Sequence, residues 1–136
     1  MSSGFPENTY FYIKTSTGQN VVDVHQGSID KTGEDSDNQL WRFENGFLIN
    51  KKSDLVLDIE GGDLKVEKKI LQYDRKHTRA HNQRWGYRDG FVYIRADPRI
   101  VLDIKGEDED EGTKVITFKR KLEDNADQQW IIEPVE

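Results

Sequence analysis

The chain has 136 residues, enough for one compact domain, and 34% of them are charged against about 25% in an average soluble protein. Its net charge of −6 argues against nonspecific binding of nucleic acid and against attachment to anionic lipid, because both depend on positive charge. No apolar run approaches the roughly 20 residues of a membrane span, and the first residues lack the features of a signal peptide. We therefore expect a soluble protein without membrane insertion, either cytoplasmic or secreted by a non-classical route.

Local patterns predict β-structure along the whole chain. The apolar runs are short, rich in Val, Ile and aromatic residues, and bounded by Gly, Asn or Asp. Two alternating runs contain Asn45-Gly46 and Asp89-Gly90, dipeptides that favour the tight turn of a hairpin. No stretch combines helical apolar spacing with a capping residue, so almost no helix is expected. In chain order, the predicted strands and hairpins are 10–13, 21–24, 41–49, 56–59, 64–73, 85–94, 101–104, 115–118 and 130–132.

Two motifs show that the chain contains three repeats. The tetrapeptide Val-Val-Asp-Val at 21–24 recurs as Val-Leu-Asp-Ile at 56–59 and 101–104, and Gln-x-Trp occurs at 39–41, 83–85 and 128–130. From the Asp to the Gln, the second and third repeats each span 25 residues (83 − 58 and 128 − 103), whereas the first spans 16 (39 − 23). Nine residues are therefore missing from the first repeat, and we expect that it has lost one strand or hairpin arm.

Three β-repeats of about 45 residues leave few architectures. A propeller needs at least four blades, whereas a closed three-fold barrel with hairpins capping one end fits the count and removes the sheet edges. The chain ends favour closure, because Tyr10–Ile13 and Trp130–Ile132 can form the two halves of one hairpin. The sequence predicts a single all-β domain over residues 1–136, a β-trefoil with a truncated first repeat. The repeats would span about 10–45, 46–89 and 90–134.

Three Gln-x-Trp elements in register with three Asp motifs resemble the ricin B-chain type β-trefoil lectins, in particular the small cysteine-free members found in fungi. The resemblance implies that Trp41, Trp85 and Trp130 pack in the shared core. It also implies a sugar site in each repeat. The Asp accepts hydrogen bonds from two sugar hydroxyls, an aromatic residue about fifteen positions later stacks on the pyranose, an Asn donates to a hydroxyl, and the Gln supports the Asp.

The resemblance gives a different outcome for each repeat. In repeat two the implied sugar-binding residues are Asp58, Tyr73, Asn82 and Gln83. In repeat three they are Asp103, Phe118, Asp127 and Gln128. Asp127 stands where the family has an amide donor, so we expect two carboxylates to crowd the third site. Repeat one lacks the aromatic residue, so no site is expected there. An Asp before a Gly-rich turn can also simply accept hydrogen bonds from the backbone of the turn, which stays an alternative for these aspartates.

Other candidate sites receive little support from the sequence. The acidic run Glu107–Glu111 lacks the ligand spacing of a calcium loop, and we interpret it as a solvated loop. His25, His77 and His81 are too scattered for a metal site, and the chain has no cysteine for disulfides or thiolate chemistry. No catalytic constellation is recognisable, so we expect no enzymatic activity, no metal and no cofactor.

Two functions therefore remain. The first is a lectin that binds glycans or glycoproteins with terminal galactose or N-acetylgalactosamine, as the resemblance implies, with its best site in repeat two and a second candidate in repeat three. The second is a β-trefoil that binds a protein partner, for example a protease inhibitor. The combination of Asp58, Tyr73 and Asn82 favours the lectin. A homodimer stays an open alternative, because the nine-residue gap could expose an apolar patch.

Overall fold

The computed structural model describes residues 3–18, 20–23, 28–30, 37–105 and 114–135, which include twelve short strands. These residues contain no α-helix, and the turns η1 (Asp37–Gln39) and η3 (Ala126–Gln128) are short 3₁₀ segments. The strands are β1 (Phe11–Thr15), β2 (Val21–Asp23), β3 (Ser28–Asp30), β4 (Trp41–Glu44), β5 (Phe47–Asn50), β6 (Val56–Ile59), β7 (Ile70–Tyr73), β8 (Trp85–Arg88), β9 (Phe91–Ile94), β10 (Asp97–Ile104), β11 (Val115–Lys119) and β12 (Trp130–Pro134).

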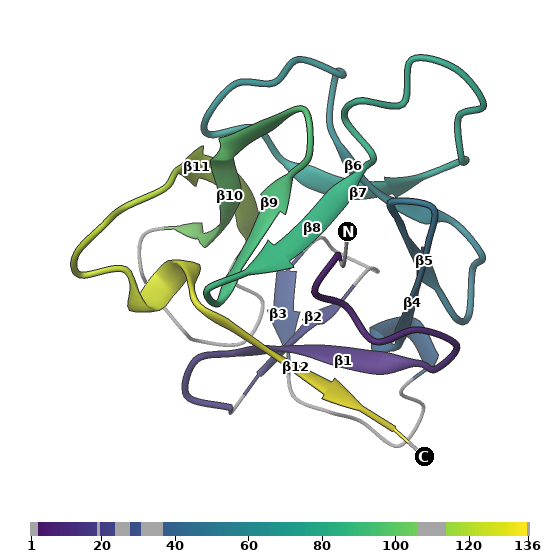
Figure 1. Ribbon diagram of the computed structural model, residues 1–136, viewed down its shortest axis with the longest axis horizontal. Coiled ribbons are helices and arrows are strands. Elements are labelled where there is room, and N and C mark those ends of the chain that lie inside the picture. Colours follow the sequence, from purple (N-terminus) through teal and green to yellow (C-terminus); the bar gives the residue numbers. More distant parts are fainter. Residues whose placement is uncertain (1–2, 19, 24–27, 31–36, 106–113, 136) are drawn as a thin grey trace.

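The strands form antiparallel hairpins arranged around a common centre (Figure 1). β12 pairs along the whole of β1, which brings the two ends of the chain together as predicted. Equivalent backbone bonds join successive repeats: Trp85 N donates to Gly46 O at 2.8 Å, and Trp130 N donates to Gly90 O at 2.9 Å. This three-fold arrangement of hairpins is a β-trefoil, so the predicted fold is confirmed. None of the helical segments among the described residues has the length and apolarity needed to cross a membrane.

The first repeat is shortened in its loop and keeps both strands. β3 pairs with β2 in the same way that β7 pairs with β6, so the expected loss of a strand or hairpin arm is wrong. Four residues connect β2 to β3, whereas ten connect β6 to β7. Asp30 lies opposite Val21, at the register position that Tyr73 and Phe118 hold in the other repeats. The deletion therefore preserves the pairing of the two strands, and it leaves an aspartate at the position that is aromatic in the other repeats.

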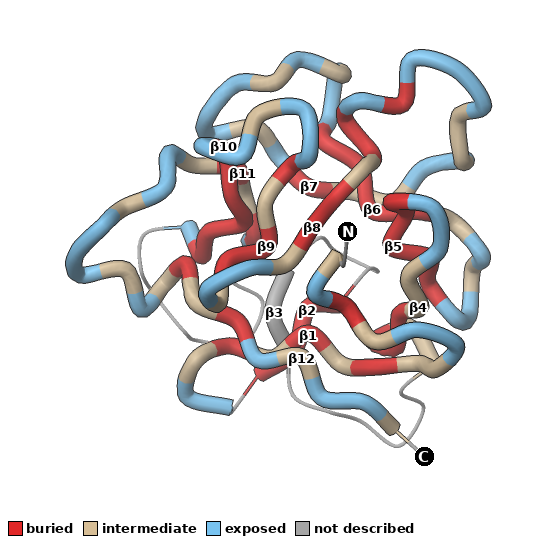
Figure 2. The backbone as a smooth tube through the Cα atoms, viewed as in Figure 1, coloured by how far each residue is buried: buried red, intermediate tan, exposed pale blue. Residues whose placement is uncertain are grey.

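Buried residues lie mainly along the strands and exposed residues in the loops (Figure 2). The three tryptophans are buried, and each is the first residue of a strand, β4, β8 or β12. Trp85 Nε1 donates to Leu57 O at 3.0 Å, and Trp130 Nε1 donates to Leu102 O at 3.2 Å. The corresponding nitrogen of Trp41 has no hydrogen-bond partner among the described residues. The indoles of Trp85 and Trp130 thus lie against the strand that carries the aspartate of their own repeat. The three tryptophans therefore pack in the core, as the sequence resemblance implied.

The N-terminal segment covers the middle of the barrel in the view of Figure 1, a feature that sequence patterns did not reveal. Phe5 is buried and stacks on Phe11 and Phe43, with ring centroids 5.5 and 4.9 Å away. Gly4 has a φ of +86°, and a side chain there would collide with the carbonyl oxygen of Tyr87. A glycine at this position therefore lets the segment approach the barrel closely.

Candidate functional site

Asp58 and Tyr73 lie on the same face of the hairpin formed by β6 and β7. Asp58 is opposite Leu71, and Tyr73 is two residues further along the same strand, so alternate side chains project the same way. Asp58 is buried, whereas Tyr73 is 55% exposed. An exposed aromatic ring beside a fixed carboxylate offers an apolar face and a hydrogen-bond acceptor to one ligand.

Gln83 holds Asp58 in position from the neighbouring loop. Its Nε2 donates to Asp58 Oδ2 at 2.8 Å and to the carbonyl oxygen of Asp74 at 2.9 Å. Its Oε1 accepts a hydrogen bond from the backbone N–H of Lys76 at 2.9 Å. All the polar groups of the Gln83 side chain are thus used within the protein, which agrees with the supporting role that the resemblance implied.

Asn82 is buried, and its side chain makes two contacts within the protein. Its Nδ2 donates to Ile59 O at 3.1 Å, and its Oδ1 accepts from Lys76 Nζ at 2.9 Å. The amide therefore ties the β6 strand to the loop before β8. The structure brings Asn82 next to Asp58, but both ends of its side chain are engaged by the protein. Lys76 is a member of the site that the sequence analysis missed.

The surroundings of Asp58 act on its acidity in opposite directions. Burial raises the pKa of the Asp58 carboxyl above its ordinary value. The hydrogen bond from Gln83, the positive charge of Lys76 and the amide of Asn82 lower it, and so offset part of the effect of burial. The site in repeat two thus pairs one carboxylate with one ammonium group.

Repeat three reproduces the same framework. Gln128 Nε2 donates to Asp103 Oδ2 at 2.9 Å and to Lys119 O at 2.9 Å, and Gln128 Oε1 accepts from Lys121 N at 2.8 Å. Phe118 occupies the register position of Tyr73, opposite a valine of β10. The two hairpins therefore differ in the side chains around this framework rather than in the framework itself.

The main difference is Asp127, which replaces the asparagine of repeat two. Its Oδ1 lies 3.0 Å from Lys121 Nζ, so the contact equivalent to Lys76–Asn82 is an ion pair. Burial raises the pKa of Asp103 to about 7, and Asp127 adds to the rise through its hydrogen bond and its negative charge. Gln128 and Lys121 act in the opposite direction. The expected crowding of two carboxylates is therefore present in the geometry.

A cavity of about 570 Å³ opens beside this pair of carboxylates. The loop between β6 and β7 forms part of its wall, because Glu67 N donates to Thr117 O and Thr117 N donates to Lys68 O at 2.9 Å. The site in repeat three is thus built from two repeats, which its own sequence could not reveal. The residues lining the cavity are Glu67, Lys69, Asp103, Ile104, Lys105, Ile116, Phe118, Lys121 and Asp127.

Repeat one retains the polar framework without the rest of a site. Asn38 Nδ2 lies 3.2 Å from Asp23 Oδ1, and Gln39 Nε2 lies 3.1 Å from Asp23 Oδ2. No aromatic residue stands at the register position of Tyr73, where the chain has Asp30. The aspartate–glutamine contact therefore occurs in all three repeats, whether or not an aromatic residue accompanies it.

The described residues contain no group of three His, Cys, Asp or Glu side chains placed to hold a metal ion. His77 and His81 lie in the loop between β7 and β8, and the ring Nε2 of His81 is 3.0 Å from Gly62 O. His25 and the acidic run Glu107–Glu111 lie outside the described residues.

Comparisons with known proteins point to one family. Residues 37–118 match the profile of the ricin-type beta-trefoil lectin domain-like family. Mucoricin from Rhizopus delemar is 40% identical over 105 residues, which cover 69% of this chain and 71% of Mucoricin. The solution structure of the mdaA-1 domain superposes with a TM-score of 0.85 and 28% identity, covering 98% of this chain and 93% of that one. The C-half of the earthworm R-type lectin, solved in complex with GalNAc, superposes with a TM-score of 0.76 and 23% identity. The match covers 93% of this chain and 99% of that one.

Proposed function

The chain belongs to the ricin-type β-trefoil lectin family, and from this we propose that it binds glycans that end in galactose or N-acetylgalactosamine. Repeat two is its principal site and repeat three a weaker one. The observation that carries the proposal is the pairing of Asp58, held by Gln83 at 2.8 Å, with the exposed ring of Tyr73 on the same face of a hairpin. The earthworm lectin, which has the same fold, was solved with GalNAc bound.

The chemistry of the two side chains suits a pyranose. A carboxylate has enough lone pairs to accept hydrogen bonds from two neighbouring hydroxyls, and an ionised acceptor makes the stronger bond. The C–H groups on one face of the sugar need an apolar surface, which the Tyr73 ring supplies. Gln83 fixes the carboxylate before the ligand arrives, so little side-chain entropy is lost on binding.

Repeat three is the weaker site in this proposal because of Asp127. A second carboxylate beside Asp103 raises the cost of keeping both ionised, and a hydroxyl donor competes with Lys121 for Asp127. Phe118 still offers an aromatic face. We propose binding without catalysis, as the sequence led us to expect.

The test is a titration of the protein with a β-galactoside, followed by calorimetry, for the wild type and for Tyr73→Ala. Removal of the ring should weaken binding about tenfold, which corresponds to about 1.4 kcal/mol. Tyr12→Ala removes a tyrosine from β1, outside the proposed site, and should leave the affinity unchanged. If the folded wild-type protein binds no glycan with terminal galactose or N-acetylgalactosamine, the proposal is wrong. Equal losses in both tyrosine variants would also contradict it.

A further inference from the structure

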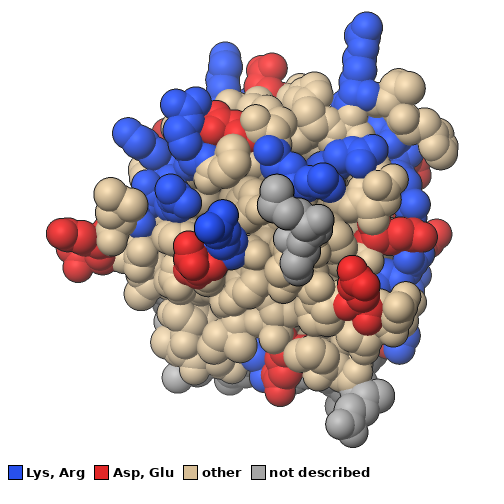
Figure 3. Space-filling view, viewed as in Figure 1, with Lys and Arg blue, Asp and Glu red and all other residues tan. Residues whose placement is uncertain are grey.

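The charges of the chain are distributed unevenly along the sequence. Residues 65–105 contain eleven basic and five acidic residues, a net charge of +6, although the whole chain carries −6. The remaining residues therefore carry nine basic and twenty-one acidic groups, a net charge of −12. In Figure 3, Lys and Arg side chains gather over the upper part of the face drawn. A chain that is acidic overall thus presents a basic region.

Part of this region surrounds the turn between β4 and β5. Arg75 and Arg84 both lie over the ring of the buried Phe47, at 5.2 and 4.8 Å from its centroid. Arg84 Nη1 also donates to the carbonyl oxygen of Asn45 at 2.9 Å. These contacts hold two guanidinium groups in place without neutralising either of them.

Arg95 reaches the same turn from the end of β9. A side chain at Gly46 would meet Arg95 Nη1 at 2.8 Å and Arg84 Cγ at 3.1 Å, so both arginines border this glycine. Arg95 is exposed, and its backbone N–H donates to Arg84 O at 2.9 Å. We call Arg75, Arg84 and Arg95 the arginine cluster.

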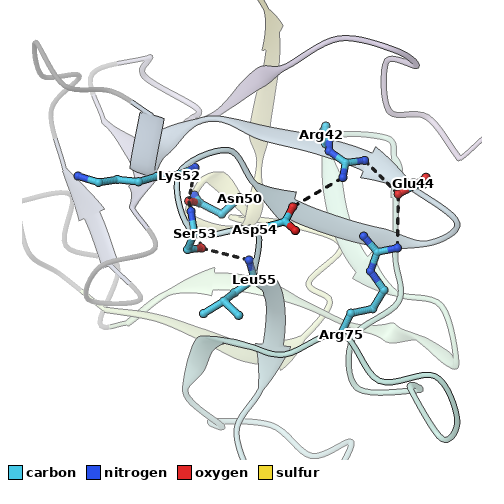
Figure 4. Close-up of polar contacts among 8 residues, drawn as sticks. All are labelled: Arg42, Glu44, Asn50, Lys52, Ser53, Asp54, Leu55 and Arg75. Atoms are coloured by element: carbon cyan, nitrogen blue, oxygen red, sulfur yellow. Dashed lines mark hydrogen bonds and ion pairs between the residues drawn. The ribbon is translucent and has the colours of Figure 1, made fainter.

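Carboxylates compensate only one side of this cluster. Glu44 Oε2 accepts from Arg42 Nη1 at 3.0 Å and from Arg75 Nη1 at 3.4 Å (Figure 4). Both contacts lower the pKa of the Glu44 carboxyl, and the contact with Arg42 has the larger effect. Within the described ranges, no Asp or Glu lies within ion-pair distance of Arg84 or Arg95. The cluster therefore has guanidinium donors that the protein leaves available to an anion.

We propose that the arginine cluster binds the sulfate group of a sulfated saccharide. The planar guanidinium group donates two parallel hydrogen bonds to an oxyanion and is weakly hydrated, so it suits this ligand better than an ammonium would. The inference rests on the proposed function, because it is the lectin fold that makes the carrier of the sulfate a glycan. Arg75 follows Tyr73 by two residues, which places the cluster next to the site of repeat two along the chain.

Nucleic acid is a less suitable occupant. A long polyanion would meet the remaining −12 charge of the chain, whereas a short sulfated glycan need contact only the basic region.

The experiment compares a sulfated galactose oligosaccharide with the same oligosaccharide after desulfation. Calorimetry should show at least about tenfold tighter binding of the sulfated form, and raising the salt concentration should weaken this form alone. The double variant Arg84→Gln/Arg95→Gln should lose the difference and bind the desulfated form as the wild type does. The control Lys52→Gln/Arg88→Gln changes the charge equally, with Arg88 at the far end of β8, and should keep the difference.

The outcomes separate this inference from the proposed function. Equal affinity for both oligosaccharides in the wild type would overturn the inference and leave the lectin proposal standing. Binding of the sulfated form alone would support the cluster and contradict the galactose site. Tighter binding of a single-stranded RNA of equal charge, lost in Arg84→Gln/Arg95→Gln, would overturn the choice of ligand. If the double variant unfolds, Arg95→Gln alone tests the cluster, since this side chain is exposed.

Discussion

Repeats two and three have the same framework and different chemistry. In both, a glutamine side chain fixes an aspartate and a lysine contacts the residue before that glutamine. In repeat two that residue is the amide Asn82, and in repeat three it is the carboxylate Asp127. The replacement of an amide by a carboxylate adds a negative charge beside Asp103, the aspartate of repeat three. In our proposal, the environment of the framework, rather than its presence, decides what each repeat binds.

Repeat one strengthens this conclusion. Asp23 and Gln39 are still in contact there, at 3.1 Å, although the aromatic position is held by Asp30. The contact therefore contributes to the fold in every repeat, and it does not by itself identify a sugar site. This agrees with the alternative interpretation of the aspartates as structural residues, at least for Asp23.

Removal of a core tryptophan should have the largest effect, and the same effect in both repeats. Trp85→Ala and Trp130→Ala should each lower the free energy of unfolding by about 3–5 kcal/mol, because each leaves a large cavity in the core. Urea denaturation measures this.

Substitution by Phe should cost about 1 kcal/mol more at Trp85 than at Trp41, which has no hydrogen bond to lose. Equal costs would contradict the role of the indole nitrogen.

The pH dependence of binding should distinguish the two sites next. In an Asp58→Ala background, which leaves repeat three to bind, affinity for galactose should fall about tenfold from pH 8 to pH 6. The reason is that the pKa of Asp103 is about 7, so its carboxylate takes up a proton over this range. In an Asp103→Ala background, the affinity of repeat two should change less. Titrations at several pH values test this, and a flat profile for repeat three would be the contradicting result.

The same shift affects stability with a defined sign. Between pH 4 and pH 7, folded Asp103 keeps a proton that the unfolded chain releases, so its contribution to stability decreases as pH rises through this window. Asp103→Asn removes this contribution. The free energy of unfolding of the variant, measured relative to that of the wild type, should therefore increase as the pH rises from 4 to 7.

Exchange of the distinguishing residue should convert one site toward the other. Asp127→Asn removes the second carboxylate, should lower the pKa of Asp103, and should raise the affinity of repeat three about fivefold. The reverse change, Asn82→Asp, should weaken repeat two, with thermal unfolding as a check because Asn82 also donates to Ile59 O. Unchanged affinity in Asp127→Asn would show that this residue does not set the difference.

The smallest effect is expected where the repeats are alike. Arg75 lies over Phe47 and Arg120 lies over Phe91, at 5.2 and 5.6 Å. Arg75→Met and Arg120→Met should each lower the free energy of unfolding by about 0.5–1 kcal/mol through the lost ring contact. Chemical denaturation of both variants measures it. A loss in only one repeat would mean that the two junctions are not equivalent.

The sequence predicted the repeating parts of the molecule well, because each depends on local patterns. The tryptophans are buried, as the family resemblance implied, and β1 pairs with β12, as the patterns at the two ends of the chain predicted. The features that it missed depend on contacts between distant segments. Phe5 packs against the aromatic rings of the barrel, and Glu67 lines the cavity of the following repeat. No local sequence pattern predicts either contact.

One error has a specific cause. The nine-residue deletion was assigned to a strand, but the register shows that the hairpin connection absorbs eight of the nine residues. Four residues separate Asp23 from its partner Ser28, whereas twelve separate Asp58 from its partner Leu71. A hairpin tolerates a shorter connection more easily than a lost strand. The donation of a hydrogen bond from Asn82 to a sugar hydroxyl stays a prediction. Its amide also donates to Ile59 O, a contact that residue type alone could not reveal, because the direction of a side chain depends on packing.

A crystal structure of the protein with a bound β-galactoside near pH 7 tests the central claim most directly. The account predicts a sugar stacked on Tyr73 in repeat two, with its hydroxyls on Asp58, and lower occupancy in repeat three. A sugar found in the cavity of repeat three alone, or in neither repeat at saturating concentration, would contradict it.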